Sequence, residues 1–421
     1  MPETVLNGSV VLDQVPVSIA LSPNDVTAVP TCAENIHALA KTFDKSDNGR
    51  RLELLAHARS LVRALETPRE TMIKHCWAQP GVYMAITMGV DIGLFKAMLA
   101  NRACSKKVSD LAPLLDVDAF LLARVMRHLA AMGCIRETGP DEYELNGFSK
   151  SLTIPIIGDG YPCLAGGGRA ALDKFSEYAA TTAYQEPRSA EHGPFQYAYN
   201  TSLNFFAYLQ ARDPLGVQFN HHMGGYRQGR PSWMDGGFFP VYERLIQGAR
   251  TDTEAVLLVD VGGNIGHDLD EFQRKHPDSP GRLVLQDLPE VLGQIAALDT
   301  GIERMSYDFL TEQPVKCARA YYMHSVLHDW PDDTCTRILT NLKAAMAPGY
   351  SKLLINENVI PDTQAHWEAT ALDMMMLALL SSKERTAAQW THLIEVQAQL
   401  KIVKIWEGGN GVESLIECEL P

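Results

Sequence analysis

The stretch that decides the fold is Leu257–Asp268, which reads LLVDVGGNIGHD. Val256–Val261 is an apolar run of the kind that forms a buried strand. Gly262, Gly263 and Gly266 follow it, and a helical pattern comes next. Glycines let the backbone approach a ligand closely, and a helix N-terminus offers free N–H groups to a carboxylate or phosphate. A strand, a glycine turn and a helix together predict the cradle of a nucleotide-binding α/β fold.

A second predicted strand, Arg282–Asp287, strengthens this interpretation because it ends in an acid about 20 residues after the last glycine. The carboxylate of Asp287 can accept hydrogen bonds from both hydroxyls of a ribose. The glycine spacing is GGxxG and not the dinucleotide pattern GxGxxG, so a nicotinamide is not the first choice of ligand. For the loop alone, a glycine-rich turn without a special ligand is the alternative interpretation.

The composition restricts the class of protein. The 421 residues are 46% hydrophobic and carry a net charge of −14. A large core is therefore expected, and the acidic balance argues against nucleic acid or an anionic membrane as a partner. No apolar run approaches the roughly 20 residues that cross a bilayer, and the N-terminus lacks the basic region of a signal peptide. The eight cysteines are scattered without a CxxC pair, which predicts reduced thiols in a cytoplasmic protein and no metal site.

The N-terminal part of the chain is predicted to be mostly helical. Residues 1–30 lack a helical period, and we expect them to be loosely ordered or to wrap a partner subunit. From Cys32 to Leu65 apolar residues recur at helical spacing, with a break at 46–49. The segment 68–100 is more apolar, and a helix pair buried on several sides is expected there. Such a pair suits either a dimer interface or an internal core.

Residues 107–145 predict two helices followed by a hairpin. The segment 107–112 begins with a capping pattern, 117–130 is strongly amphipathic, and Gly133 ends the second helix. A turn at 139–141 then joins two short strands. Two helices and a two-stranded wing form a winged helix. DNA binding is one function of such a module, but the second helix is not basic enough, so we favour a dimerisation and substrate-lid role.

Residues 150–250 predict a mixed helical region, in which adjacent His221 and His222 favour packing or lid contacts over metal ligation. After Ala255 strands alternate with helices. The expected strands are 256–261, 282–287, 303–308, 318–326, 351–360, 400–407 and 412–419. The expected helices lie near 266–276, 289–298, 332–346, 365–380 and 387–399. Only four residues, GGNG at 408–411, separate the last two strands, so the final strand should run antiparallel.

Four motifs carry a resemblance to a known family: LVDVGG (258–263), QDLP (286–289), HDWPDD (328–333) and KERT (383–386). With them, the chain from about Leu52 to its end resembles fungal S-adenosylmethionine-dependent O-methyltransferases of natural-product biosynthesis, relatives of the plant caffeic acid type. The resemblance implies an α/β fold with a Rossmann-like class I methyltransferase domain, whose parallel sheet has an antiparallel last strand, and an N-terminal helical winged-helix dimerisation domain.

The resemblance also divides the chain into four segments. Residues 1–66 would hold an N-terminal segment and dimerisation helices, and 67–150 a winged-helix-like dimerisation domain. Residues 151–250 would form a helical linker and substrate lid, and 251–421 the Rossmann-like domain that binds the cofactor.

The resemblance further implies roles for individual residues. S-adenosyl-L-methionine would be the cofactor, with Asp287 on the ribose and Asp308 with Phe309 on the adenine. The implied cofactor contacts are Asp260, Gly262, Gly263, Asp287, Leu288, Asp308, Phe309 and His324. The implied general base is His328, flanked by Glu357 and Glu384. The implied substrate contacts are Phe195, Trp233, Asp329, Asp373, Met374 and Met375.

These residue types suit methyl transfer. A methyl on a sulfonium needs only an in-line oxygen nucleophile, so positioning supplies most of the acceleration. An imidazole can take the hydroxyl proton as attack begins, and Glu357 or Glu384 can orient the ring. Two positions depart from the family. Asn264 stands where another glycine is frequent, although asparagine tolerates the left-handed conformation, and His324 stands where plant relatives have lysine.

Three functions follow as hypotheses. The first is methylation of a hydroxyl of a polyketide or polyketide–peptide metabolite by a homodimer. The second is a pericyclase on the same fold, which catalyses dehydration and hetero-Diels–Alder or Alder-ene cyclisation of a quinone-methide-type intermediate without methyl transfer. The filled positions His328, Glu357 and Glu384 favour the first, and the altered loop at Asn264 favours the second. A non-catalytic dimeric partner is disfavoured because every catalytic position is filled.

Overall fold

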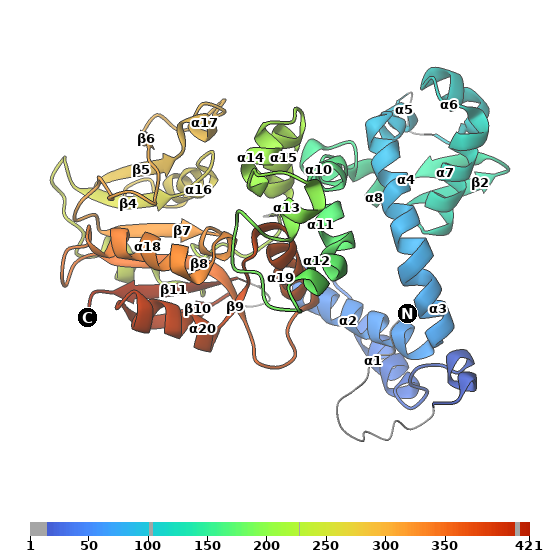
Figure 1. Cartoon of the computed structure of the whole chain (residues 1–421), viewed down its shortest axis with the longest axis horizontal. Helices are drawn as coiled ribbons and strands as arrows, with labels where there is room; N and C mark the ends of the chain where they lie inside the picture. Colours follow the sequence, from blue (N-terminus) through green and yellow to red (C-terminus); the bar gives the residue numbers. More distant parts are fainter. Residues whose placement is uncertain (1–14, 101–103, 227, 409–412) are drawn as a thin grey trace. The chain divides into compact units, whose positions relative to one another are not determined.

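The computed structural model describes residues 15–100, 104–226, 228–408 and 413–421 (Figure 1). The chain folds as two compact units, Met1–Ile154 and Pro155–Pro421. The finer division into four segments stays a prediction. Residues 1–14 of the segment 1–30, for which a loose or partner-wrapping course was expected, lie outside the described residues, and the described remainder holds the short 3₁₀ helix η1 (Val17–Leu21) and the start of α1 at Val29.

The N-terminal unit begins with helices whose ends are set by local capping. The break expected at 46–49 is confirmed, because α2 begins at Asn48 and the side chain of Asp47 accepts a hydrogen bond from the Arg50 N–H. Thr67 and Glu70 form a reciprocal capping box where α3 begins. The elements are α1 (Val29–Lys41), α2 (Asn48–Leu65), α3 (Pro68–Ile73), the π-helical segment η2 (Lys74–Ala78), α4 (Gln79–Asp91) and α5 (Leu94–Leu99).

The two helices and hairpin expected at 107–145 are present. They are α6 (Val108–Leu114), α7 (Ala119–Ala131), β2 (Ile135–Gly139) and β3 (Glu142–Leu145). A third strand that the sequence did not reveal, β1 (Lys106–Lys107), pairs with β3, which gives the sheet order β1-β3-β2. The capping pattern expected at 107 is wrong, because Lys107 makes no side-chain cap; Asp118 caps α7 instead. The unit ends with α8 (Gly147–Ser151).

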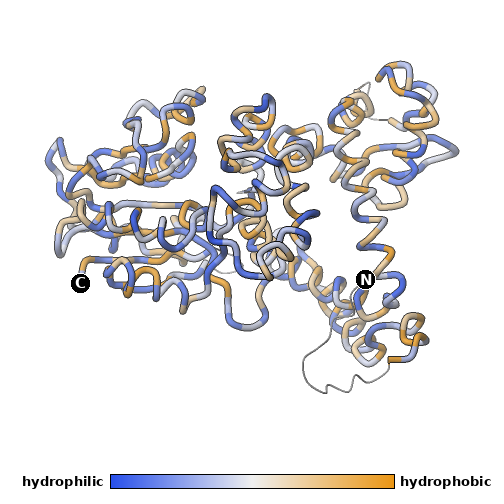
Figure 2. Tube along the Cα trace, viewed as in Figure 1, coloured by the Kyte–Doolittle hydropathy of each residue, from blue (hydrophilic) through white to orange (hydrophobic). Residues whose placement is uncertain are grey.

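Burial on several sides was expected for the helices at 68–100; Leu94, Phe95 and Met98 of α5 are buried, but α4 does not meet this expectation. The buried residues of α4 are Ala85, Ile86 and Gly89, whereas Trp77 is 68% exposed and Met84 is 60% exposed. Helix α1 has no buried residue at all. Figure 2 shows hydrophobic stretches recurring along these helices. Helical periodicity indicates that a face is apolar but not what covers it, and Trp77 and Met84 are left exposed by the part of the chain that the structure describes.

The C-terminal unit opens with a layer of short helices. Phe195 lies at the centre of their core, with its ring centroid 5.6 Å from that of Phe205 and 5.3 Å from that of Tyr208. Residues of α19 (Trp367–Leu380) complete this core. The helices are α9 (Pro155–Gly158), α10 (Gly160–Gly167), α11 (Arg169–Asp173), α12 (Phe175–Thr181), α13 (Pro194–Tyr199), α14 (Phe205–Gln210) and α15 (Leu215–Tyr226).

An eight-stranded sheet forms the rest of this unit. Its order is β10-β11-β8-β7-β4-β5-β6, with β9 paired to β8. The strands are β4 (Val256–Val261), β5 (Arg282–Asp287), β6 (Ile302–Ser306), β7 (Ala320–His324), β8 (Lys352–Ile360), β9 (Arg385–Thr386), β10 (Lys401–Glu407) and β11 (Glu413–Glu419). Strands β6, β5, β4, β7 and β8 run parallel, and β11 lies antiparallel between β8 and β10. The expected parallel sheet with an antiparallel last strand is therefore confirmed.

Helices cover both faces of the sheet, and each face has its own apolar core. On one face Leu258 and Tyr322 pack with Phe272 of α16 (His267–Lys275). On the other face Val259 and Met323 pack with residues of α18 (Asp332–Lys343), α20 (Ala387–Thr391) and η5 (His392–Gln397). A π-helical segment, η3 (Tyr242–Ile246), precedes β4.

One predicted helix is much shorter than expected. The pattern at 289–298 gives only α17 (Pro289–Leu292), and Gly293 is its C-cap. No helix of the described residues is long and apolar enough to cross a membrane.

Candidate active site

The glycine loop lies at the carboxyl end of β4, between the ends of β5 and β7. This is the point where the strand order reverses, and open α/β sheets bind their ligands there. Gly262 and Asn264 both have positive φ, at 73° and 54°, so the expectation that Asn264 adopts the left-handed conformation is confirmed. A Cβ on Gly263 would lie 2.5 Å from the carboxyl carbon of Asp260 and 2.5 Å from a methyl of Leu285. Only glycine fits there, and it lets the loop pack closely against Asp260 of β4 and Leu285 of β5.

Asp287 ties this loop to the end of β5. Its carboxylate accepts hydrogen bonds from the N–H of Asn264 at 2.8 Å and from the N–H of Leu288 at 2.7 Å. Burial raises the pKa of Asp287, and the two N–H groups oppose that rise. The side chain of Leu288 is 46% exposed beside it. A carboxylate held in this way presents its remaining lone pairs at the sheet edge, where ribose hydroxyls can donate to them.

The residues after β6 reach the same edge. The ring of Phe309 lies 3.7 Å from a Cβ built on Gly262, and its centroid lies 5.9 Å from that of Trp330 in an edge-on contact. Asp308 is exposed, and its carboxylate accepts the N–H of Leu310 at 2.9 Å. The structure thus brings Gly262 and Phe309 together and leaves the carboxylate of Asp308 at the surface.

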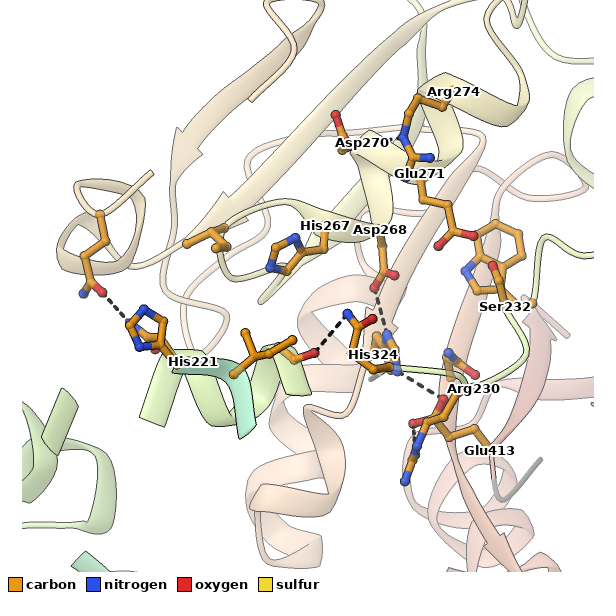
Figure 3. A pocket seen from close by; sticks show the side chains of 18 of the residues that line it. His221, Arg230, Ser232, His267, Asp268, Asp270, Glu271, Arg274, His324 and Glu413 are labelled. Atoms are coloured by element: carbon orange, nitrogen blue, oxygen red, sulfur yellow. Dashed lines mark hydrogen bonds and ion pairs between the residues drawn. The ribbon is translucent and has the colours of Figure 1, made fainter. Parts of the chain in front are cut away.

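His324 ends β7 on the face of the sheet that α16 covers. Its Nδ1 lies 2.8 Å from Oδ2 of Asp268, and its Nε2 lies 3.4 Å from Oε2 of Glu413 (Figure 3). Arg230 continues the network through contacts of 2.5 Å to Glu413 and 2.7 Å to Glu368. Burial disfavours a charged imidazole, but Asp268 and Glu413 outweigh it and raise the pKa of His324 to about 10. The raised pKa favours the protonated form of His324 at neutral pH.

A cavity of about 660 Å³ adjoins this network, between α15, the segment 228–233 and α16 (Figure 3). Four of its lining residues have a buried polar atom without a hydrogen-bond partner, namely Nε of Arg230, the indole Nε1 of Trp233, Nε2 of His324 and the amide Oδ1 of Asn356. Arg230 and Trp233 supply donors and Asn356 an acceptor, so the cavity suits a ligand that carries both kinds of group, as an amino-acid group does. Together with the glycine cradle and the acid on β5, these residues fit S-adenosylmethionine.

His328 lies in a separate, buried cluster on the loop after β7. Its Nδ1 is 2.7 Å from Oε1 of Glu384 and 3.6 Å from Oε2 of Glu357, and its Nε2 is 3.4 Å from Oδ1 of Asp329. Burial disfavours the imidazolium, but the carboxylates of Glu357, Asp329 and Glu384 outweigh it and raise the pKa of His328 to about 10. Burial also raises the pKa of Asp329 to about 7.

The structure separates the two glutamates that the sequence left equivalent. Glu384 makes the direct hydrogen bond to the ring. Glu357 instead accepts three backbone N–H groups on one oxygen, from Val326 at 3.0 Å, Leu327 at 2.8 Å and His328 at 3.3 Å. Its other oxygen is buried without a hydrogen-bond partner and acts on the ring through charge alone. Glu384 therefore orients the imidazole, and Glu357 holds the loop.

The ligand atoms of His328, Glu357 and Glu384 all lie within 4.8 Å of one another, a spacing that could hold a metal ion. The direct 2.7 Å contact between Nδ1 and Glu384 is a hydrogen-bond distance. Two ligands bound to one zinc ion at about 2.1 Å each would stand further apart. The geometry thus favours a shared proton over a shared cation.

The implied substrate contacts occupy different surroundings. Phe195 is fully buried in its aromatic core, and Trp233 is 2% exposed beside the cavity. Asp373 accepts the backbone N–H of Glu384 at 2.8 Å. Met374 is 50% exposed, and Met375 packs half-buried against the helical core. Asp329 touches His328, so Asp329 and Asp373 lie beside the candidate base, and all six substrate roles stay predictions.

The sequence analysis missed several polar residues of this site. Asp268 follows the glycine loop, and a charged residue at that position was a usable signal. Arg230 and Glu413 lie 183 positions apart in the chain. The sequence around them carried no signal, because only the fold brings them together.

Comparisons with known proteins agree with this geometry. A sequence profile of the O-methyltransferase domain matches residues 246–398. The O-methyltransferase mpaG of Penicillium roqueforti is 38% identical over 396 residues, which cover 93% of this chain and 99% of that protein. The solved structure of LepI in complex with SAM superposes with a TM-score of 0.82 at 28% identity, over 94% of this chain and 99% of LepI. A structure described as a pericyclic reaction enzyme superposes with the same TM-score, identity and coverage.

The class I methyltransferase fold, the cofactor cradle and a relative that matches almost the whole chain therefore lead to one conclusion. The chain belongs to the S-adenosylmethionine-dependent O-methyltransferase family of fungal secondary metabolism.

Proposed function

We propose that this enzyme methylates a hydroxyl of a polyketide or polyketide–peptide metabolite, with His328 as the general base. The observation that carries the proposal is the 2.7 Å hydrogen bond between Nδ1 of His328 and Glu384. This bond leaves Nε2 as the ring nitrogen available to an acceptor hydroxyl. The 38% identity to an enzyme named as an O-methyltransferase supports it.

The proposed mechanism assigns one task to each residue. The bound cofactor supplies an electrophilic methyl on a sulfonium. Nε2 of His328 takes the proton of the acceptor hydroxyl, which converts a weak nucleophile into an oxyanion as attack begins. Glu384 holds the resulting imidazolium by a hydrogen bond, and Glu357 stabilises its charge from 3.6 Å. For the cofactor we assign Gly262, Gly263 and Asp260 to the cradle, Asp287 with Leu288 to the ribose, and Asp308 with Phe309 to the adenine.

A pericyclase is the second candidate. It is supported by the superposition on a structure described as a pericyclic reaction enzyme, with a TM-score of 0.82. In that case His328 and Asp329 would donate or remove protons during a dehydration, and the methyl would stay on the cofactor. The 3.4 Å contact between Nε2 and Asp329 supplies such a pair.

Mass spectrometry separates the two candidates. The purified enzyme is incubated with cofactor and a panel of phenolic and enolic polyketide precursors. A product heavier by one methyl, with S-adenosylhomocysteine formed in equal amount, is the expected result. A dehydrated or isomeric product with the cofactor unconsumed would instead establish the pericyclase. A cofactor-free reaction serves as the control for spontaneous cyclisation.

We also propose that the enzyme is a cytoplasmic homodimer in which the winged-helix-like module and the N-terminal helices form the interface. The exposed apolar side chains of the N-terminal unit support this, among them Val17 at 88%, Leu21 at 70%, Trp77 at 68% and Met84 at 60%. Apolar groups at such density favour burial against a second copy. The eight cysteines are free, as expected of a reducing compartment.

Removal of residues 1–66 is expected to convert the dimer into a monomer and to lower activity, because helices α1 and α2 would no longer supply apolar surface to the interface. Light scattering at micromolar concentration measures the mass. Trp77→Ser with Met84→Ser is the less invasive variant, and Val396→Ser, at a 62% exposed position of η5 in the C-terminal unit, is the control for exposed-surface changes. A full-length chain that is monomeric in this assay would refute the dimer.

A further inference from the structure

The loop that carries His328 is short and irregular. It comprises Ser325, whose φ is 51°, and the 3₁₀ turn η4 (Leu327–Asp329). No sheet or long helix imposes its backbone path. A general base must be placed against its hydroxyl to within a few tenths of an ångström. The position of His328 therefore depends on contacts made from outside the loop.

The amide side of this loop is held by Glu357, as described above. On the carbonyl side, the Cys335 thiol of α18 donates to the carbonyls of Leu327 at 3.1 Å and of Trp330 at 3.3 Å, and two further residues bind the same side. Arg385 donates to the carbonyl of Leu327 at 3.0 Å and to that of Trp330 at 2.9 Å. The hydroxyl of Ser382 donates to the carbonyl of His328 itself and, at 2.9 Å, to that of Trp330. Every carbonyl of the turn except that of Asp329 thus has a donor from the segment 382–385.

Arg385 is itself fixed in place. Its side chain has no exposed surface, and it forms a two-pronged contact with Oδ1 of Asp332, at 3.0 Å from Nε and 2.8 Å from a terminal nitrogen. Lys383 lies 3.0 Å from the other oxygen of Asp332. A planar guanidinium paired in this way has few accessible rotamers. Its hydrogen bonds therefore fix the positions of the carbonyls that accept them.

The segment 382–385 therefore contacts both the ring and the backbone of His328. Glu384 sits between Ser382 and Arg385 in sequence and bonds the ring, while its neighbours bond the backbone. The segment is anchored to the sheet, because Arg385 and Thr386 of β9 pair with Val359 and Ile360 at the end of β8. Its backbone is also tied to α19, through the N–H of Glu384 to Asp373 and the N–H of Ser382 to Met376.

We propose that Ser382 and Arg385 are positioning residues for the reaction, which set where Nε2 of His328 stands without touching substrate or cofactor. The inference rests on the proposed role of His328 as the base. It predicts that loosening the loop lowers turnover and disturbs the ring, but leaves the cofactor cradle intact.

The test compares Ser382→Ala and Arg385→Lys with two controls. Ser382→Ala removes one hydroxyl, and Arg385→Lys keeps the charge but loses the planar fork. Ser382→Thr keeps the hydroxyl and should retain turnover. Ser351→Ala is the matched structural control, because its buried hydroxyl also donates to a backbone carbonyl, that of Ala318, at 2.6 Å and outside this loop.

We expect kcat to fall about tenfold in Ser382→Ala and about a hundredfold in Arg385→Lys, since misplacement by about an ångström costs that order of rate. Cofactor affinity measured by calorimetry should stay unchanged. If turnover in both variants falls no more than in Ser351→Ala, the proposal is overturned.

A second readout does not depend on which reaction the enzyme catalyses. In histidine-labelled enzyme, NMR follows the titration of the His328 ring, assigned with the His328→Gln variant. Three carboxylates face this ring, those of Glu357, Glu384 and Asp329. In Ser382→Ala and Arg385→Lys the ring should titrate at lower pH as it moves from Glu384, and in Ser351→Ala it should not move. An unmoved titration in both loop variants would overturn the positioning role even if the wild type transferred no methyl.

Discussion

Replacement of His328 by alanine is expected to slow methyl transfer by roughly 10²–10⁴-fold, the usual contribution of a positioned general base. Cofactor affinity should remain, because the glycine cradle and Asp287 do not contact this residue. The rate should fall because the neighbouring carboxylates of Glu357 and Glu384 face the ring and are held by it and by the loop N–H groups. Single-turnover rates with labelled cofactor measure the chemical step directly.

Removal of the imidazole also leaves buried carboxylates without their cation, so the alanine variant can lose stability. His328→Gln is the better matched change, because its amide can still donate to Glu384 while it has no basic nitrogen. His392→Ala, at an exposed position of η5, is the control. Normal rate and products in a folded His328→Gln enzyme would leave His328 a structural residue.

The pH profile gives a second check on the same residue. Since the surrounding carboxylates raise the pKa of His328 to about 10, the free enzyme holds this ring protonated at neutral pH. The base-competent fraction therefore grows as the pH rises, and kcat/KM should increase up to about pH 10. When the cofactor is bound, its sulfonium charge disfavours a protonated His328 beside it. The rise of kcat with pH should therefore occur at lower pH than the rise of kcat/KM. A cationic donor would show the opposite trend, with activity falling as the pH rises.

Asp287→Ala is expected to weaken S-adenosylmethionine binding by about 1.5–3 kcal/mol, the value of a charge-assisted hydrogen bond to a buried group. The loss has two parts. The ribose would lose its acceptor, and the loop would lose the 2.8 Å contact through which Asp287 holds the N–H of Asn264. Isothermal calorimetry measures the affinity. kcat at saturating cofactor should change much less, because Asp287 does not contact His328.

Two further variants show how much of the lost cofactor affinity is due to the charge of Asp287 and how much any exposed loop acid would cost. Asp287→Asn keeps an oxygen for the Asn264 N–H and removes the charge, so it should lose less affinity than alanine. Asp299→Ala is the control, because this exposed acid also binds a loop N–H, that of Gly301 at 2.8 Å, outside the cradle. Equal affinity of Asp287→Ala and wild type would remove Asp287 from the cofactor site.

The candidate site shows where sequence patterns stop being informative. His328 and Glu384 lie in motifs that carry the family resemblance, and the same resemblance implied Glu357 as the second glutamate beside the base. Which glutamate binds the ring depends on a difference of less than an ångström, 2.7 Å against 3.6 Å to Nδ1, which follows from how β8 and the segment 382–385 meet. Of the network of Arg230, Glu413 and His324, only His324 was predicted from the sequence, because Arg230 and Glu413 come from distant parts of the chain and carry no local pattern.

The sequence by itself determined the local structure of the sheet. Strands β4 and β5 begin and end at the residues that the sequence predicted, and the turn at Asn264 adopts the conformation that asparagine tolerates. These features depend on burial periodicity and on the allowed backbone angles of single residues. Tertiary structure decided the rest: that α17 stops at Leu292, that the apolar faces near Trp77 and Met84 are left uncovered, and that Ser382 and Arg385 bind the His328 loop. Each of these depends on which surfaces meet in space, and that information is absent from any window of neighbouring residues.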